Sequence, residues 1–90
     1  MLRFVFDEAK STLNEEKHGI DFIEAQVLWE DPDRLEIPAM TKGEPRHAII
    51  GKIGQKEWTA IITYRGDAIR IISVRRAHEK EAMCYNDRGI

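Results

Sequence analysis

The chain has 90 residues, of which 42% are hydrophobic and 33% charged, and its formal net charge is −2. This length predicts one domain with one core, over residues 1–90, and this composition excludes a disordered chain. The single cysteine excludes a disulfide framework, and no run approaches the ~20 apolar residues of a membrane span, so we expect a cytoplasmic protein without a membrane segment.

Charge is distributed unevenly along the sequence. Residues 1–41 carry four Lys or Arg and ten Asp or Glu, a net −6, whereas residues 42–80 carry nine and four, a net +5. Such an asymmetry indicates two surfaces with different partners. The basic part fits a polyanion such as nucleic acid, and the acidic part either fits a basic protein or is an ordinary solvated surface.

The first third of the sequence predicts a short strand and two helices. Residues 2–6 are rich in the aromatic and β-branched side chains that strands prefer. Asp7 offers an N-cap for a helix that should end at Gly19, a glycine suited to the left-handed C-terminal position. An Asp-Phe-Ile-Glu capping box at residues 21–24 then predicts a second helix, ending near Trp29.

The remainder predicts strands joined by short turns and then a helix. A proline break at residues 31–33 ends the second helix, and glycine-containing turns at 54–55 and 66–67 predict hairpins. The expected elements are an extended piece at 34–37, a loop at 39–45, strands at 46–53, 57–64 and 68–75, and a helix from Ala77 to about Arg88.

The predicted order is therefore β-α-α-β-β-β-β-α. Short hairpin connections favour an antiparallel sheet with two N-terminal helices and one C-terminal helix packed on one face, which is an α+β fold. Strict alternation along the last strand would place Arg75 on the same face as Ile71, and Arg70 and Arg76 on the other.

The end of this last strand is the most informative segment. Three arginines fall within the seven residues from Arg70 to Arg76, and a helix is expected to begin just beyond. Guanidinium groups bind phosphate through two parallel hydrogen bonds, and helix N-termini favour anions. The junction therefore predicts a phosphate site. The structural alternative is that the arginines pair with acids such as Asp67, Glu79 or Glu81 and only hold the fold together.

Three other residues are candidates for the chemistry. Lys17 and His18 end the first helix, where cations complement the helix dipole. They could instead act on a substrate, since lysine neutralises developing charge and histidine exchanges protons near neutral pH. Glu57 lies among cationic residues and could serve as a general base, although a cross-strand partner role is the simpler interpretation.

The closing helix and its start supply further candidates for RNA contact. These are Arg76, Lys80 and Tyr85, although Tyr85 could equally be a helix packing residue. Trp58 and Tyr64 share a face and are expected in the core rather than as a stacking platform. There is no glycine-rich phosphate loop, zinc spacing or HExxH motif, so we expect no metal and no cofactor. Charge stabilisation would then come from Arg and Lys, and proton transfer from His or Glu.

The residues at two sets of positions, in this order and spacing, resemble the BrnT toxins of bacterial type II toxin–antitoxin systems. The match spans nearly the full length, with departures at Val74, where the family usually has alanine, and at the bulky Trp58. The first set is Phe6-Asp7-Glu8-Ala9-Lys10, Asn14, Lys17-His18-Gly19-Ile20, Phe22, Glu24-Ala25 and Asp31-Pro32. The second set is Ile50-Gly51, Tyr64-Arg65-Gly66, Arg70-Ile71-Ile72-Ser73, Arg75, Ala77, Glu81 and Tyr85.

The resemblance implies a ribonuclease with a RelE-like architecture. It also implies a cognate BrnA-like antitoxin that covers the toxin and contacts operator DNA through its own DNA-binding part. The motif positions that it marks as site candidates are Lys17, His18, Arg65, Arg70 and Arg75. The roles of Glu57, Arg76 and Lys80 depend on the residue patterns alone.

These observations lead to two hypotheses. The first is an endoribonuclease toxin that cuts RNA by metal-independent 2′-hydroxyl attack, inhibits growth and forms a hetero-oligomer with its antitoxin. It expects the guanidinium groups of the last strand to converge with Lys17 and His18 around one open anion-binding pocket, in which Arg70 and Arg75, and also Arg65, hold the phosphorus centre. The alternative is a non-catalytic nucleic-acid-binding or regulatory protein-interaction module, in which the basic segment is only an electrostatic footprint.

Overall fold

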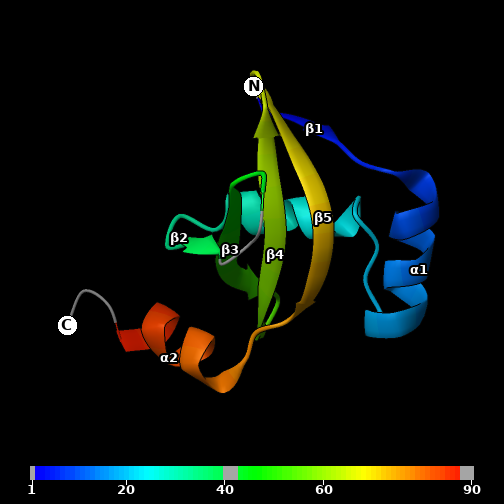
Figure 1. Cartoon of the computed structure of the whole chain (residues 1–90). Helices are drawn as coiled ribbons and strands as arrows, with labels where there is room; N and C mark the ends of the chain where they lie inside the picture. The colour runs from blue at the N-terminus through cyan, green and yellow to red at the C-terminus, as the bar shows by residue number, and fades with distance from the viewer. Residues whose placement is uncertain (1, 40–42, 88–90) are drawn as a thin grey trace.

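The computed structural model describes residues 2–39 and 43–87, which form an α+β domain with a five-stranded sheet and three helices (Figure 1). The predicted α+β class is confirmed. The elements are β1 (Arg3–Val5), α1 (Glu8–His18), the 3₁₀ helix η1 (Glu24–Glu30), β2 (Leu35–Ala39), β3 (Arg46–Ile53), β4 (Lys56–Arg65), β5 (Ala68–Arg76) and α2 (Glu79–Asp87). The last residue expected in the closing helix, Arg88, lies outside the described residues.

The sheet is mixed rather than purely antiparallel, which corrects the prediction. Its strand order is β1-β5-β4-β3-β2, and the neighbours from β5 to β2 are antiparallel, whereas β1 runs parallel to β5. Hairpin connections determine only the pairing of strands that follow one another. Because β1 reaches β5 only through the rest of the chain, its direction was not constrained by any turn.

The first helix begins where its cap predicts, whereas the second begins later than its capping box predicts, at Glu24, and differs in type. Asp7 accepts hydrogen bonds from the backbone N–H groups of Ala9 and Lys10, and α1 ends at Gly19 with φ 79°. Asp21 likewise accepts from the backbone N–H groups of Ile23, just before η1, and Glu24, its first residue. The buried residues of this segment recur every third position, at 22, 25 and 28. A 3₁₀ helix aligns that spacing in one column, so η1 presents a single apolar ridge to the sheet.

One side of the sheet, here the core face, packs against η1 and the segment before it. The core-face side chains of β3, β4 and β5 include Ile49, Ala60, Ile62, Ile71 and Val74, all at most 2% exposed. Glycine at residue 51 allows close contact with η1, since an added Cβ would lie 3.2 Å from the Leu28 side chain, tighter than an ordinary contact. The opposite side of the sheet therefore remains for other contacts.

A β-bulge in β5 reverses the predicted orientation of Arg70. Ile61 pairs with Ser73 and Ile62 with Ile71, so Ile72 is an extra residue with no partner. A bulge shifts the alternation by one residue. Arg70, which pairs with Thr63, therefore lies on the same face as Arg75, which contradicts the expectation from strict alternation. We call this side, which carries Arg65, Arg70 and Arg75 with Thr59 and Thr63, the arginine face.

The sequence predicts that all helices pack on one face of the sheet, and this prediction is wrong. α1 runs beside β5, where Asn14 exchanges hydrogen bonds with the backbone of Val74, whereas α2 contacts the arginine face through Glu81 (Figure 1). In the described part of the chain, no helix is long and apolar enough to span a membrane. The arginine face is thus covered by α2 at one end, the end at which β5 terminates.

Candidate functional site

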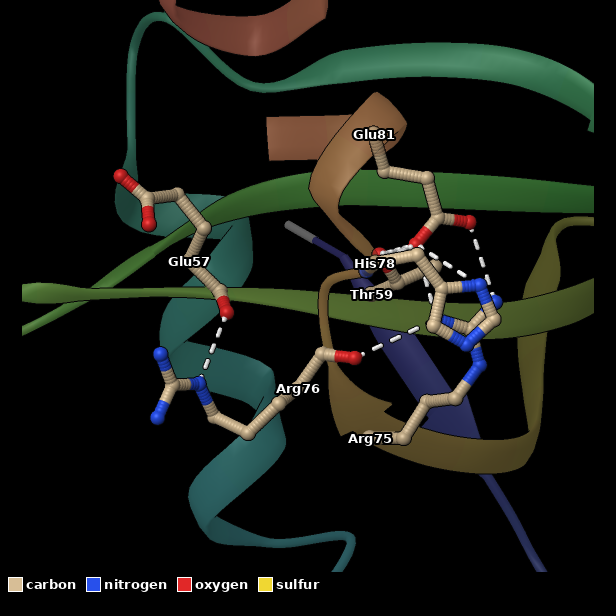
Figure 2. A network of polar contacts seen from close by, with 6 residues as sticks. All are labelled: Glu57, Thr59, Arg75, Arg76, His78 and Glu81. Atoms are coloured by element: carbon tan, nitrogen blue, oxygen red, sulfur yellow. Dashed lines mark hydrogen bonds and ion pairs between the residues drawn. The ribbon is translucent and has the colours of Figure 1, made fainter. Parts of the chain in front are cut away.

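Arg75 is the centre of a polar network between β5, β4 and α2 (Figure 2). Its two terminal nitrogens donate to the two carboxylate oxygens of Glu81, at 2.8 and 3.0 Å. This is the bidentate geometry in which guanidinium binds carboxylate or phosphate most strongly. The Arg75 and Glu81 side chains are 25% and 18% exposed, so solvent screens the pair only partly.

Two further groups donate to the same carboxylate. The hydroxyl of Thr59, which is fully buried, lies 3.0 Å from Oε1, and the backbone N–H of His78 lies 2.8 Å from it. The imidazole Nδ1 of His78 is 3.9 Å from this oxygen, on a side chain that is 69% exposed. Four donors, from β4, β5 and the segment that precedes α2, therefore converge on one anionic group.

This environment changes the acidity of Glu81. The hydrogen bonds from Arg75 lower the pKa of Glu81 to about 2; burial opposes this shift, and the bonds from the His78 N–H and the Thr59 hydroxyl support it. A lowered pKa means that the folded state favours the ionised form. The network is therefore a stable anion-binding arrangement at neutral pH.

The shift predicts how stability depends on pH. Glu81 should contribute its full stabilisation above the ordinary glutamate pKa of 4.5 and lose it as the pH falls towards about 2. Urea unfolding across that range should therefore show a steeper loss of stability in the wild type than in Glu81→Gln. Parallel pH profiles for the two proteins would contradict this assignment.

The other arginines of this face are spread along it. Arg70 is half-buried, and its side chain forms no hydrogen bond or ion pair with any other described residue. Arg65 forms an ion pair with Glu44 at 3.3 Å. It lies six positions along β4 from Thr59, the residue that pairs with Arg75, and six strand positions span about 20 Å. The described residues enclose no pocket. The expected convergence of all three arginines in one pocket is therefore absent from this structure.

Arg76 lies on the core face instead. It pairs with Trp58, and its guanidinium carbon is 5.6 Å from the centre of the Trp58 ring, a cation–π distance. Its Nε also donates to the backbone oxygen of Glu57 at 3.3 Å (Figure 2). Because neighbouring positions of a strand face opposite ways, the Arg76 side chain points away from the network of Arg75, while its backbone oxygen accepts a 3.3 Å hydrogen bond from Arg75 Nη1.

Lys17 and His18 lie at the end of α1, beside the terminal part of β5. Asn14, one turn earlier on the same helix face, is hydrogen-bonded to Val74, and α1 and β5 run in the same direction (Figure 1). Lys17 is exposed and His18 half-buried, and neither side chain forms a hydrogen bond or ion pair with another described residue. The pair is thus at the Arg75 end of the molecule without direct contact to Arg75.

The remaining candidates are placed less favourably. The Glu57 carboxylate points away from Arg75 and accepts a 3.3 Å hydrogen bond from Asn86 (Figure 2). Lys80 is exposed on α2. Tyr85 is only 9% exposed, and its hydroxyl donates to Asp31, so its ring packs against the protein and supports the packing interpretation over base stacking.

A second polar cluster, which the sequence did not predict, lies on the core face. The carboxylate of Glu36 accepts a 2.7 Å hydrogen bond from the hydroxyl of Tyr64 and lies 3.2 Å from Nδ1 of His47. Burial and this carboxylate raise the pKa of Tyr64 to about 12. Tyr64 is 45% exposed, which corrects its expected place in the core, whereas Trp58 does pack against the core. Residues from three strands form this cluster, and no local motif connects them.

Thr59 and His78 of the Arg75 network were also missed. Thr59 is one of several threonines in a strand, and nothing in its neighbourhood marks it. His78 had one weak signal, because it precedes Glu81 by three residues, the spacing of a capping box. The contact between α2 and β4 that makes both residues relevant is tertiary.

One known protein family matches most of the chain. The family described as ribonuclease toxin, BrnT, of type II toxin-antitoxin system matches residues 6–81. The matched region contains Lys17, His18 and the whole Arg75 network. No curated protein matches the chain.

Proposed function

The chain belongs to the BrnT family of type II ribonuclease toxins, and from this membership we propose that it cuts RNA on its arginine face. One observation carries the proposal: Arg75 already holds an anion by two parallel hydrogen bonds, with a hydroxyl and an N–H directed at the same anion. Arg70 lies on the same face with no internal partner among the described residues. Together these groups suit a phosphodiester.

The proposed reaction is attack by the 2′-hydroxyl of the substrate on the adjacent phosphorus. A new O–P bond forms as the bond to the 5′ oxygen breaks, leaving a 2′,3′-cyclic phosphate and a 5′-hydroxyl end. Negative charge accumulates on the phosphoryl oxygens, and fixed cations stabilise it. Arg75 supplies that charge, and Arg70 and Arg65, farther along the face, hold flanking phosphates.

Proton transfer has three candidates in this proposal. One group must remove the proton of the 2′-hydroxyl, and another must protonate the departing 5′ oxygen. His18 and Glu57 are the candidates from the sequence, with Lys17 stabilising developing charge. His78 joins them because its ring lies at the edge of the Arg75 network. This set of cations and proton-exchanging groups supports a mechanism without a metal.

The family also implies an antitoxin partner and an RNA target. We propose a BrnA-like antitoxin that forms a hetero-oligomer with this protein in the cytoplasm and contacts operator DNA itself. The acidic first part of the chain, with a net −6 over residues 1–41, is the surface suited to a basic partner. A RelE-like architecture is part of the same proposal.

The cleavage proposal predicts a defined product. Purified protein should convert an RNA oligonucleotide to fragments with 2′,3′-cyclic phosphate ends at the same rate with and without EDTA, and should leave the 2′-deoxy oligonucleotide intact. Mass spectrometry of the fragment ends measures this. Loss of cleavage on chelation would reject the metal-free route, and cleavage of the 2′-deoxy strand would reject 2′-hydroxyl attack.

The ion pairs of Arg75 and Arg65 favour a second candidate function. Since both arginines are balanced by carboxylates, the face could bind nucleic acid without cutting it. A protein of that kind would bind RNA with a steep dependence on salt and leave it intact. Rescue of growth by co-expression of the neighbouring open reading frame would instead identify a toxin with its antitoxin.

A further inference from the structure

We propose that the Glu81 carboxylate occupies a phosphate site formed by Arg75, the Thr59 hydroxyl and the backbone N–H of His78. In the cutting complex, a phosphate of the RNA takes the place of this carboxylate. The identification of the ligand as RNA rests on the proposed function, whereas the anion site itself rests on the geometry of the network.

The donors are arranged around the anion as a phosphate requires. Oε1 of Glu81 receives three hydrogen bonds, from Arg75 Nη1 at 2.8 Å, Thr59 Oγ1 at 3.0 Å and His78 N at 2.8 Å. Oε2 receives one, from Arg75 Nη2 at 3.0 Å. Two non-bridging phosphate oxygens can accept the same bidentate pair, and the remaining donors then fall on one of them. Because β4, β5 and the segment before α2 each contribute a donor, the fold assembles the site.

Access to the site depends on one side chain. Glu81 reaches the donors from the first turn of α2, and rotation of its side chain would expose the Arg75 guanidinium, already 25% exposed, to a ligand. Arg70 lies on the same face and would favour an incoming anion. While Glu81 is bound, its charge balances Arg75, so a phosphate must compete with it. Glu81 therefore lowers the affinity of the protein for phosphate.

A purely structural role for Glu81 makes a different prediction. The His78 N–H contact also has the spacing of a capping box at the start of α2, so removing the carboxylate should cost stability in either case. Only the phosphate-site proposal expects a gain in anion binding. The decisive measurement is therefore binding rather than stability.

The experiment uses the full chain and inorganic phosphate as the probe. Phosphate is titrated into ¹⁵N-labelled wild type, Glu81→Gln and the matched control Glu79→Gln, which removes one charge from the same turn of α2 outside the network. Chemical shifts of the His78 amide and the Arg75 Nε report binding. Glu81→Gln should bind phosphate about tenfold more tightly than the other two, the effect of losing one competing charge-assisted hydrogen bond. Adding Arg75→Gln should remove the gain.

Equal phosphate affinity in Glu81→Gln, Glu79→Gln and wild type would overturn the proposal. If Glu81→Gln does not fold, Glu81→Asp retains the charge on a shorter side chain, holds the donors less well and should show a smaller gain. Its affinity remaining at the wild-type value would equally count against the site. Because no RNA is present, failure of RNA cleavage would leave this result unaffected. Tighter phosphate binding without any RNA cleavage would confirm the anion site and reject the cleavage reaction, whereas tighter phosphate binding without any RNA binding would reject RNA as its ligand.

Discussion

Replacing Arg75 with alanine is expected to lower the rate of RNA cleavage by about 10²–10³-fold, the usual effect of removing one positioned donor that stabilises transition-state charge. In the proposed mechanism, the Arg75 guanidinium is the group that holds the phosphorus centre in a bidentate geometry. The rate is measured on an RNA oligonucleotide at saturating concentration, after circular dichroism has shown that the variant is folded.

Two control variants separate chemistry from folding. Arg75→Lys retains the charge next to Glu81 but not the planar fork, so it should keep the fold and still lose most of the activity. Arg76→Ala removes a neighbouring arginine from the opposite face and should cut RNA at nearly the wild-type rate. Cleavage by Arg75→Ala at the wild-type rate would reject the role of Arg75. A large loss of rate in Arg76→Ala alone would indicate that RNA is cut on the core face.

Replacing Asn14 with alanine is expected to lower the free energy of unfolding by about 3 kcal/mol. The Asn14 amide donates to the backbone oxygens of Ile20 and Val74, at 2.8 and 2.9 Å, and accepts from the Val74 N–H at 3.1 Å. Asn14 thereby supplies hydrogen-bond partners to the backbone groups of β5 that β1 does not pair with, and it is only 7% exposed. Each buried backbone group left unpaired costs about 1–3 kcal/mol, and water can reach some of them.

Urea unfolding with a matched control measures this effect. Asn86→Ala also removes an asparagine that forms two hydrogen bonds, but Asn86 is exposed on α2, so the loss should stay below about 1 kcal/mol. A loss in Asn14→Ala no greater than that in Asn86→Ala would show that Asn14 does not join α1 to the sheet in this way.

Local signals in the sequence identified most of the elements. Asp7 and Gly19 define α1 because capping involves only neighbouring backbone groups, and the two glycine turns define the β3–β4 and β4–β5 hairpins for the same reason. Tertiary features were not predictable. The extra residue at Ile72 reverses the orientation of Arg70, and no residue type at that position signals a bulge.

The site was predicted in part for the same physical reason. Arg75 and Arg70 were identified because arginines at a strand end indicate phosphate binding. Their neighbours were not, since the position of α2 on the arginine face determines that Glu81, Thr59 and His78 meet Arg75. The expected pocket with Lys17 and His18 assumed that arginines close in sequence converge in space. A strand instead rises about 3.3 Å per residue, so arginines on one strand are distributed along the sheet.

The proposal that RNA binds to the arginine face is tested best by a titration of ¹⁵N-arginine-labelled protein with a 2′-deoxy oligonucleotide that cannot be cut. The measured quantity is the shift of each arginine Nε resonance. Binding at this face should move the signals of Arg70 and Arg75 and leave those of Arg3 and Arg76 in place. Movement of Arg76 with Arg75 unchanged would contradict the proposal, because it would place the nucleic acid on the opposite side of the sheet.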